Sequence, residues 1–232
     1  MGIITMGIPA GITLFLRDNF HCNTFIETGT FYGGTATWAA QNFEKVYTIE
    51  YSKEIFEATS TKYAHIKNIS FCYGDTRTLL KDIIIQNQND PLIIWLDAHW
   101  CSGATFGEND QCPLIDEIKA LNTSDADQFI LIDDARLFLS PPPLPHSLKQ
   151  YPTIARVIEE LNKKLRFIAV YDDVIFAIPV KHESVFREFL QSKITNELVA
   201  QNSTPYKTPL ATKVVRKLKS VLNSLINNKK SQ

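Results

Sequence analysis

The sequence predicts a doubly wound α/β fold with a seven-stranded sheet, and three features lead to that prediction. Short apolar runs alternate with helix-like segments at the spacing of βαβ units. Two of the runs, 91–96 and 129–132, are apolar throughout, which is typical of central parallel strands covered on both faces. The last two runs are joined by a hairpin-length connection, which predicts an antiparallel pair at the end of the sheet.

The individual elements follow from where each apolar run begins and ends. Strands are expected at 24–27, 46–50, 69–73, 91–97, 128–133, 166–170 and 173–179. Helices are expected near 34–41, 53–65, 76–87, 113–122 and 152–164, and again at 184–200. Two loops, 99–112 and 140–146, are longer than a connection requires, so they are expected to be lids, specificity elements or surface decoration.

Length and composition are those of one soluble domain with an appendage. The chain has 232 residues, 44% of them hydrophobic and 21% charged. Its net charge of -1 does not indicate that the chain as a whole binds nucleic acid. The four cysteines show no CxxC spacing, so we expect reduced thiols in a cytoplasmic protein. The apolar start lacks a basic region, and no run is long enough to span a bilayer.

The C-terminal segment differs from the rest of the chain. We expect residues 1–200 to form the main domain and residues 201–232 to form a polar linker followed by a basic amphipathic helix. From Tyr206 to Gln232 there are seven basic and no acidic residues. This helix could pack on the domain, form a homodimer contact or lie on an anionic membrane surface. Nucleic-acid binding is not expected, because the segment has only one aromatic residue.

Acidic residues follow four of the predicted strands, and one of them precedes a glycine-containing turn. The first apolar run ends in Glu27, before the segment 28–34, and the second ends in Glu50. Two later runs end in Asp97 and in the pair Asp133-Asp134. A glycine turn between a strand and a helix brings backbone N–H groups to a nucleotide-like ligand, and an acid at the position of Glu50 can bind both hydroxyls of a ribose. The four strand ends therefore predict one ligand-lined edge.

These residues resemble the motifs of class I S-adenosylmethionine-dependent methyltransferases, over roughly residues 20–180. Segment 27–34 resembles the first motif of that family, under the methionine part of the cofactor, and Glu50 resembles its ribose-binding acid. Segment 74–76 resembles the adenine-binding motif, and Asp97 falls at the motif beside the transferable methyl group. The resemblance implies a Rossmann-like methyltransferase fold and these cofactor-binding residues: Glu27, Thr28, Gly29, Thr30, Phe31, Glu50, Asp75, Thr76 and Asp97.

Phe31 departs from the family pattern, because it stands where the second glycine is usual. We therefore expect a wider turn. The same side chain disfavours a nicotinamide-dependent oxidoreductase, because a dinucleotide fingerprint needs glycine there for the backbone to approach a pyrophosphate. For two other pairs of residues, a purely structural role stays open. Asp75 and Thr76 could serve as a helix N-cap signal, and the Asp133-Asp134 pair could form only a cap or a turn.

The second half of the predicted site resembles a narrower group, the metal-dependent sugar O-methyltransferases. The resemblance implies that Asp97, Asp133 and Asp134 hold a divalent cation, with Mg²⁺ suited to three carboxylates and open water positions. It also places His99 where that group carries a general base. His99 could instead be a fourth metal ligand or a structural donor to the loop. Asp97 and His99 are the expected catalytic residues.

The function that the resemblance implies is methyl transfer from S-adenosylmethionine to a hydroxyl group. The expected acceptor is a sugar or a glycosylated small molecule, and a divalent cation is expected to assist. Two alternatives stay open: a metal-independent small-molecule methyltransferase, and a non-catalytic binding protein that retains the fold.

Overall fold

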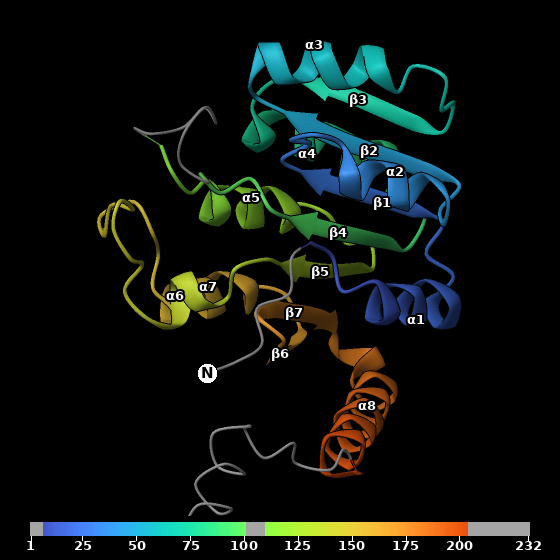
Figure 1. Cartoon of the computed structure of the whole chain (residues 1–232), viewed down its shortest axis with the longest axis vertical. Coiled ribbons are helices and arrows are strands. Elements are labelled where there is room, and N and C mark those ends of the chain that lie inside the picture. Colours follow the sequence, from blue (N-terminus) through green and yellow to red (C-terminus); the bar gives the residue numbers. More distant parts are fainter. Residues whose placement is uncertain (1–6, 101–109, 204–232) are drawn as a thin grey trace, which may run out of the picture. The chain divides into compact units, whose positions relative to one another are not determined.

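A seven-stranded sheet organises the protein. The structure is a computed structural model that describes residues 7–100 and 110–203. The strands are β1 (Thr24–Thr28), β2 (Lys45–Glu50), β3 (Ile69–Tyr73), β4 (Leu92–Leu96), β5 (Gln128–Ile132), β6 (Arg166–Tyr171) and β7 (Val174–Pro179). Their order is β3-β2-β1-β4-β5-β7-β6, from top to bottom in Figure 1. Strands β1 to β5 are parallel, and β7 is antiparallel to both β5 and β6. The predicted sheet and terminal hairpin are confirmed.

The helices lie between the strands as the sequence predicts, with two additions. They are α1 (Ala10–Phe20), α2 (Gly34–Ala40), α3 (Lys53–Lys62), α4 (Thr76–Gln86), α5 (Leu114–Leu121), α6 (Arg136–Leu139), α7 (Ile154–Leu161) and α8 (Glu183–Ser203), with a 3₁₀ turn η1 (Val180–His182) before α8. The sequence did not predict α1 or α6. Helix α1 buries Ile12 and Leu16, and its Phe20 ring stacks on Phe129 of β5 at 4.8 Å.

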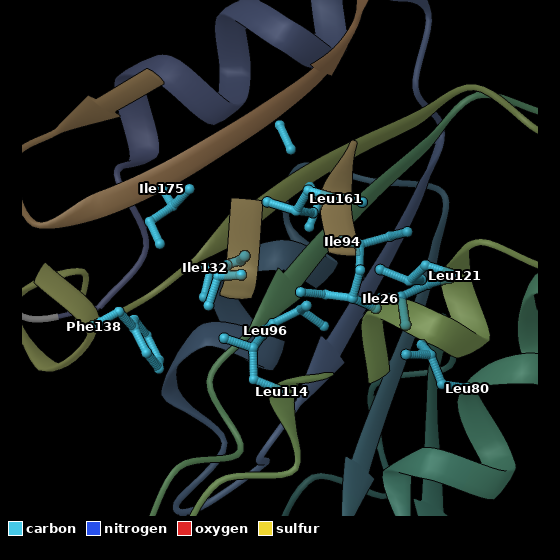
Figure 2. Packing of buried hydrophobic residues seen from close by; sticks show 14 of the residues in the cluster. Ile26, Leu80, Ile94, Leu96, Leu114, Leu121, Ile132, Phe138, Leu161 and Ile175 are labelled. Carbon is cyan, nitrogen blue, oxygen red and sulfur yellow. The ribbon is translucent and has the colours of Figure 1, made fainter. Parts of the chain in front are cut away.

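Alternate residues of the central strands face two helical layers. Ile26, Ile94 and Ile132 belong to one buried cluster that includes residues of α4, α5 and α7. Figure 2 shows part of this cluster, with Leu80 of α4, Leu114 and Leu121 of α5 and Leu161 of α7 among the labelled side chains. On the other face, Phe25 of β1 packs against Trp38 and Phe43, in and after α2. Burial on both faces explains the continuous apolar runs.

The strand order places the ligand edge. From β1 the chain proceeds outward through β2 to β3 and then returns to β4, on the other side of β1. In an open parallel sheet, a crevice forms outside the carboxyl ends of the strands where the order reverses. That point lies between β1 and β4. Gly29 and Asp97 follow these two strands directly, so the sequence pattern and the topology indicate the same edge.

The chain divides after Phe186 into two units. In the first, the Phe186 ring packs against Phe176 at 5.6 Å. The second is helical as far as Ser203, with an ion pair of 2.6 Å between Lys193 and Glu197. Residues 204–232, on which the prediction of a basic amphipathic helix falls, lie outside the described residues, and the division of the chain at residue 200 stays a prediction. Among the helices described, none combines the length and the apolar character that a bilayer span requires.

Candidate active site

The turn after β1 approaches the end of β4 very closely. Gly29 has φ +86°, and a Cβ atom there would lie 2.6 Å from the backbone oxygen of Asp97. The Gly29 N–H donates to Ile49 O at 2.9 Å, and the Asp97 N–H donates to Thr28 O at 3.2 Å. Gly29 is therefore needed both for its positive φ and for the space it leaves, and the turn is fixed to the strands on either side.

Replacing this glycine should distort the site. We expect Gly29→Ala to lower the free energy of unfolding by about 1–3 kcal/mol, because it adds both a left-handed strain and a backbone clash. S-adenosylhomocysteine binding should weaken with it. Gly34→Ala is the matched control, because no atom lies within 4 Å of its added Cβ atom. Denaturant unfolding of both variants tests this, and equal stability of the two would contradict it.

Phe31 adopts the backbone conformation that a glycine would normally supply. Its φ is +47°, in the left-handed region, and its N–H donates to Glu50 Oε2 at 3.0 Å. The side chain is 49% exposed, and its ring lies 4.0 Å from that of Tyr32. The turn thus places a backbone N–H next to the β2 carboxylate even though Phe31 replaces glycine.

Glu50 is held by two backbone donors. Besides the bond from Phe31, its Oε1 accepts from the N–H of Ser52 at 2.8 Å. Each carboxylate oxygen accepts more than one hydrogen bond, so both oxygens keep capacity for a further donor. The side chain is half-buried at the end of β2. This geometry suits the predicted capture of two ribose hydroxyls, because the carboxylate is oriented before any ligand arrives.

Glu27 lies inside the fold instead of at its surface. It is buried, and its Oε2 accepts from the Thr48 hydroxyl at 2.7 Å, which in turn lies 2.6 Å from the Thr30 hydroxyl. Burial raises the pKa of Glu27 to about 8, although hydrogen bonds from Thr48 and Thr35 lower it. Thr30 was predicted as a cofactor-binding residue, whereas Thr48 and Thr35 were not predicted as site residues. Thr48 could be found only from the strand register, in which it stands opposite Glu27.

Asp75 caps α4 and forms an ion pair. Its Oδ1 accepts from the N–H of Arg77 at 2.9 Å, and its Oδ2 lies 2.6 Å from the Arg77 guanidinium group. Arg77 also pairs with Asp110 at 2.7 Å. The hydrogen bonds from Arg77 lower the pKa of Asp75. The capping interpretation of Asp75 is therefore correct, and its contact with adenine stays a prediction.

A pocket opens beside this ion pair, at the expected adenine end of the site. Its lining residues come from the ends of β2 and β4, the turn before α4 and the segment before α5: Tyr51, Asp75, Thr76, Arg77, Ala98, Asp110 and Pro113. Asp75 and Thr76 were predicted from the sequence. Tyr51, Ala98 and Pro113 were not, because they carry no distinctive chemistry and reach the pocket only through the topology.

Asp97, Asp133 and Asp134 form an electrostatically linked group at the ends of β4 and β5. Burial raises the pKa of Asp97 to about 9, and the charges of Asp133, Asp134 and Glu27 add to this. Burial, with the charge of Asp134, also raises the pKa of Asp133 to about 7. At the ends of β4 and β5, the carboxyl groups of Asp97 and Asp133 therefore ionise unfavourably unless a cation is near.

The side-chain positions of these acids do not form a ready metal site. Among residues 7–100 and 110–203, no three His, Cys, Asp or Glu side chains come together closely enough to hold a metal ion. Asp133 Oδ1 accepts from the N–H of Asp134, and the Asp134 carboxylate lies 2.8 Å from Arg136. Arg136 also contacts Asp173, in the turn between β6 and β7. The carboxylate chemistry suits a hard cation, but Asp134 is already paired.

His99 is buried in an aromatic environment. Its ring lies 5.3 Å from that of Phe138 and 6.4 Å from that of Tyr151. Burial lowers the pKa of His99 to about 4, although the nearby Asp134 carboxylate raises it. The imidazole is therefore neutral at pH 7. A neutral ring can accept a proton, but this low pKa makes it a weaker base than an ordinary histidine. Its role as base, ligand or structural group stays a prediction.

Comparison with solved structures identifies the fold. A provisionally named methyltransferase from Streptococcus mutans, in complex with SAH, matches with a TM-score of 0.52 at 11% identity, over 75% of this chain and 99% of that one. A provisionally named caffeoyl-CoA O-methyltransferase from Staphylococcus aureus matches with a TM-score of 0.51 at 13% identity, over 76% of this chain and 86% of that one. This chain has the class I methyltransferase fold. No protein-family model matches the sequence, and no curated protein matches it significantly.

Within the methyltransferase fold, the predicted residues lie along one edge. Glu27, Gly29 and Glu50 meet around the turn after β1, where hydrogen bonds join the ends of β1 and β2. Asp75 and Thr76 line the pocket beyond β2. Asp97 and Asp133 follow adjacent strands on the other side of β1. The assignment of each residue to the cofactor, the metal or catalysis stays a prediction.

Proposed function

We propose that this protein transfers a methyl group from S-adenosylmethionine to a hydroxyl group of a sugar or glycosylated small molecule, assisted by a divalent cation. The observation that carries the proposal is the Glu50 carboxylate, fixed by two backbone N–H groups at the cofactor edge of a class I methyltransferase fold. The S. mutans structure contains SAH, and the S. aureus protein is named as an O-methyltransferase. The first supports the cofactor, and the second supports a hydroxyl acceptor.

In this proposal, different residues bind different parts of the cofactor. Glu50 accepts from the ribose hydroxyls, and the pocket at Asp75 and Thr76 receives the adenine. The turn 28–31 contacts the methionine part, and its shape is fixed by N–H groups of Gly29, Thr30 and Phe31 that donate to Ile49 O and Glu50 Oε2. S-adenosylmethionine supplies an electrophilic methyl group on a sulfonium ion. The acids at Glu27 and Asp97 suit that positive charge, because a cation nearby lowers the pKa of a buried carboxyl group and favours its ionised form.

The acceptor side of the proposed site is formed by the acids after β4 and β5. Asp97, Asp133 and Asp134 would hold the cation, and Asp134 would have to leave Arg136 to take part. A bound divalent cation would lower the pKa of an acceptor hydroxyl. His99 is uncharged above about pH 4 and is the candidate that takes the hydroxyl proton. Positioning the hydroxyl in line with the methyl group supplies much of the rate.

A metal-independent methyltransferase is the second candidate. The ion pair between Asp134 and Arg136 favours it, because it gives Asp134 a structural partner. Arg136 also donates its backbone N–H to Asp173 Oδ1 at 2.8 Å, so the loop after β5 is held without a cation. In this case Asp97 is the carboxyl group near the methyl group, and the Asp133-Asp134 pair serves only as a turn former.

Calorimetry and a methyl-transfer assay test the proposal together. We expect micromolar binding of S-adenosylhomocysteine, followed by transfer of labelled methyl from S-adenosylmethionine to a member of a sugar and glycoside panel with Mg²⁺. EDTA should abolish transfer, and Asp97→Asn and His99→Ala should lower it. Transfer that EDTA leaves undiminished would support the metal-independent candidate. A folded protein that binds no S-adenosylhomocysteine would refute both candidates.

A further inference from the structure

Glu117 is a buried acid that the proposed chemistry leaves without a role. It lies on α5 and is 0% exposed. Neither of its carboxyl oxygens makes a hydrogen bond of regular geometry within the described residues. A buried carboxyl group costs stability unless it is satisfied, so its position calls for an explanation.

Glu117 interacts with residues that line the cofactor pocket. Its N–H donates to Pro113 O at 3.1 Å, and Pro113 lines the pocket. Its carboxyl group interacts with the hydroxyls of Thr76, another lining residue, and Thr28, at the end of β1. Thr28 Oγ1 accepts from the Asp97 N–H at 3.2 Å. Glu117 therefore interacts with one residue from the adenine end of the site and one that contacts the methyl end.

We propose that Glu117 is a positioning residue: in its neutral form it bridges the Thr28 and Thr76 hydroxyls and so fixes the ends of β1 and α4 that form the cofactor pocket. This inference rests on the proposed function. A neutral carboxyl group can donate to one hydroxyl and accept from the other, whereas a carboxylate can only accept. Ionisation also leaves a buried charge uncompensated.

The surroundings of Glu117 favour the neutral form. Burial raises its pKa to about 7, while hydrogen bonds from Thr76 and Thr28 lower it. The charged groups that face it are Asp75, which raises this pKa, and Arg77, which lowers it. These two belong to the ion pair that caps α4, so their charges largely offset each other. The thiol of Cys112 also interacts with it electrostatically, and burial raises the pKa of that thiol to about 12.

The consequence is a cofactor affinity that depends on pH. If only the form with neutral Glu117 binds well, the apparent dissociation constant increases as the neutral fraction decreases. One pH unit above a pKa of about 7, roughly one-tenth of the molecules remain neutral at this position. We therefore expect the dissociation constant of S-adenosylhomocysteine to rise about tenfold between pH 6 and pH 8.

The test is calorimetric titration with S-adenosylhomocysteine at pH 6, 7 and 8, for the parent and for Glu117→Gln. Glutamine keeps the shape and neutrality of the acid form, so the variant should bind at pH 8 about as tightly as the parent at pH 6. Glu117→Ala should bind weakly at every pH. Glu160→Gln, at a buried acid of α7 that pairs with Lys163 away from the pocket, is the matched control and should keep the parental profile.

The outcomes separate this inference from the proposed function. If the parent binds with the same affinity from pH 6 to pH 8, or if Glu117→Gln shows the same pH dependence as the parent, the positioning role is refuted and the function stands. If the folded parent binds at none of the three pH values, both are refuted. If Glu117→Gln does not fold, Glu117→Ala takes its place: a pH dependence as large as that of the parent would refute the positioning role, and its loss would assign the dependence to Glu117.

Discussion

Replacing Glu50 with alanine is expected to weaken S-adenosylhomocysteine binding by roughly a hundredfold or more. The proposed ribose contacts are two hydrogen bonds to a charged group, each worth about 1.5–3 kcal/mol. Loss of both corresponds to at least about two decades in the dissociation constant. The substitution also removes the acceptor that orients the N–H groups of Phe31 and Ser52. Calorimetric titration measures the effect directly.

Two further variants separate ribose binding from a general disturbance of the turn. Glu50→Gln retains one carbonyl oxygen as an acceptor, so it should lose affinity by less than Glu50→Ala. Glu54→Ala removes an exposed acid in the first turn of α3 and should leave affinity unchanged. If Glu50→Ala binds as tightly as the parent while remaining folded, Glu50 is not the ribose-binding acid, and the assignment of the cofactor edge loses its main support.

The second large effect is a loss of stability as the pH rises. Four carboxyl groups of the site have a raised pKa in the folded protein, chiefly through burial: Glu27 to about 8, Asp97 to about 9, Glu117 to about 7 and Asp133 to about 7. Between the ordinary carboxyl range near pH 4 and these values, the folded state binds more protons than the unfolded state. The free energy of unfolding must therefore decrease as the pH rises through this window.

We expect the ligand-free protein to lose several kcal/mol of stability, as an order of magnitude, between about pH 5 and pH 9. The stability contributed by these groups is fully present below about pH 4. Asp75 acts in the opposite sense, because Arg77 lowers its pKa, and its contribution is lost when the pH falls below the ordinary carboxyl range. His99 also opposes the loss between about pH 4 and its ordinary value near pH 6.5, because burial lowers its pKa to about 4, so the net loss is steepest above that range.

Denaturant unfolding at a series of pH values, in EDTA to remove adventitious cations, measures this dependence. Glu27→Gln should make the profile shallower and should be more stable than the parent near pH 9, because the variant has no charge to bury. The advantage of S-adenosylmethionine over S-adenosylhomocysteine as a stabilising ligand should be greatest at high pH, because only the former carries a sulfonium charge that can pair with ionised carboxylates. An increase in stability from pH 5 to pH 8 would contradict the expectation.

The acids at the ends of the strands could be predicted from sequence because their position in a parallel sheet is fixed by topology. Glu50 and Asp97 each follow an apolar run, and parallel strands bring such positions to one edge. The terminal hairpin was equally predictable, because only a short connection joins its strands. These conclusions depend on spacing along the chain and not on side-chain packing.

What escaped prediction depends on contacts between distant residues. Glu117 stands between Asp116 and Lys119 in a segment that resembles a solvated helix face, yet α5 turns it toward Thr28 and Thr76. The aromatic surroundings of His99 come from Phe138 and Tyr151, beyond β5 in the chain. Helix α1 was missed because its apolar start gave no capping signal, and Pro9 provides no side-chain cap.

The contact between Arg136 and Asp173 has a consequence for the order in which the protein is completed during synthesis. The loop that carries Asp133 and Asp134 follows β5, but the Ala135 N–H donates to Asp173 O, in the turn between β6 and β7. Strand β7 must also pair with β5. A nascent chain that has emerged only as far as β5 already contains all five parallel strands of the proposed cofactor edge. It still lacks the turn between β6 and β7, which anchors the loop after β5. The acceptor side of the site is therefore the last part to acquire its final shape.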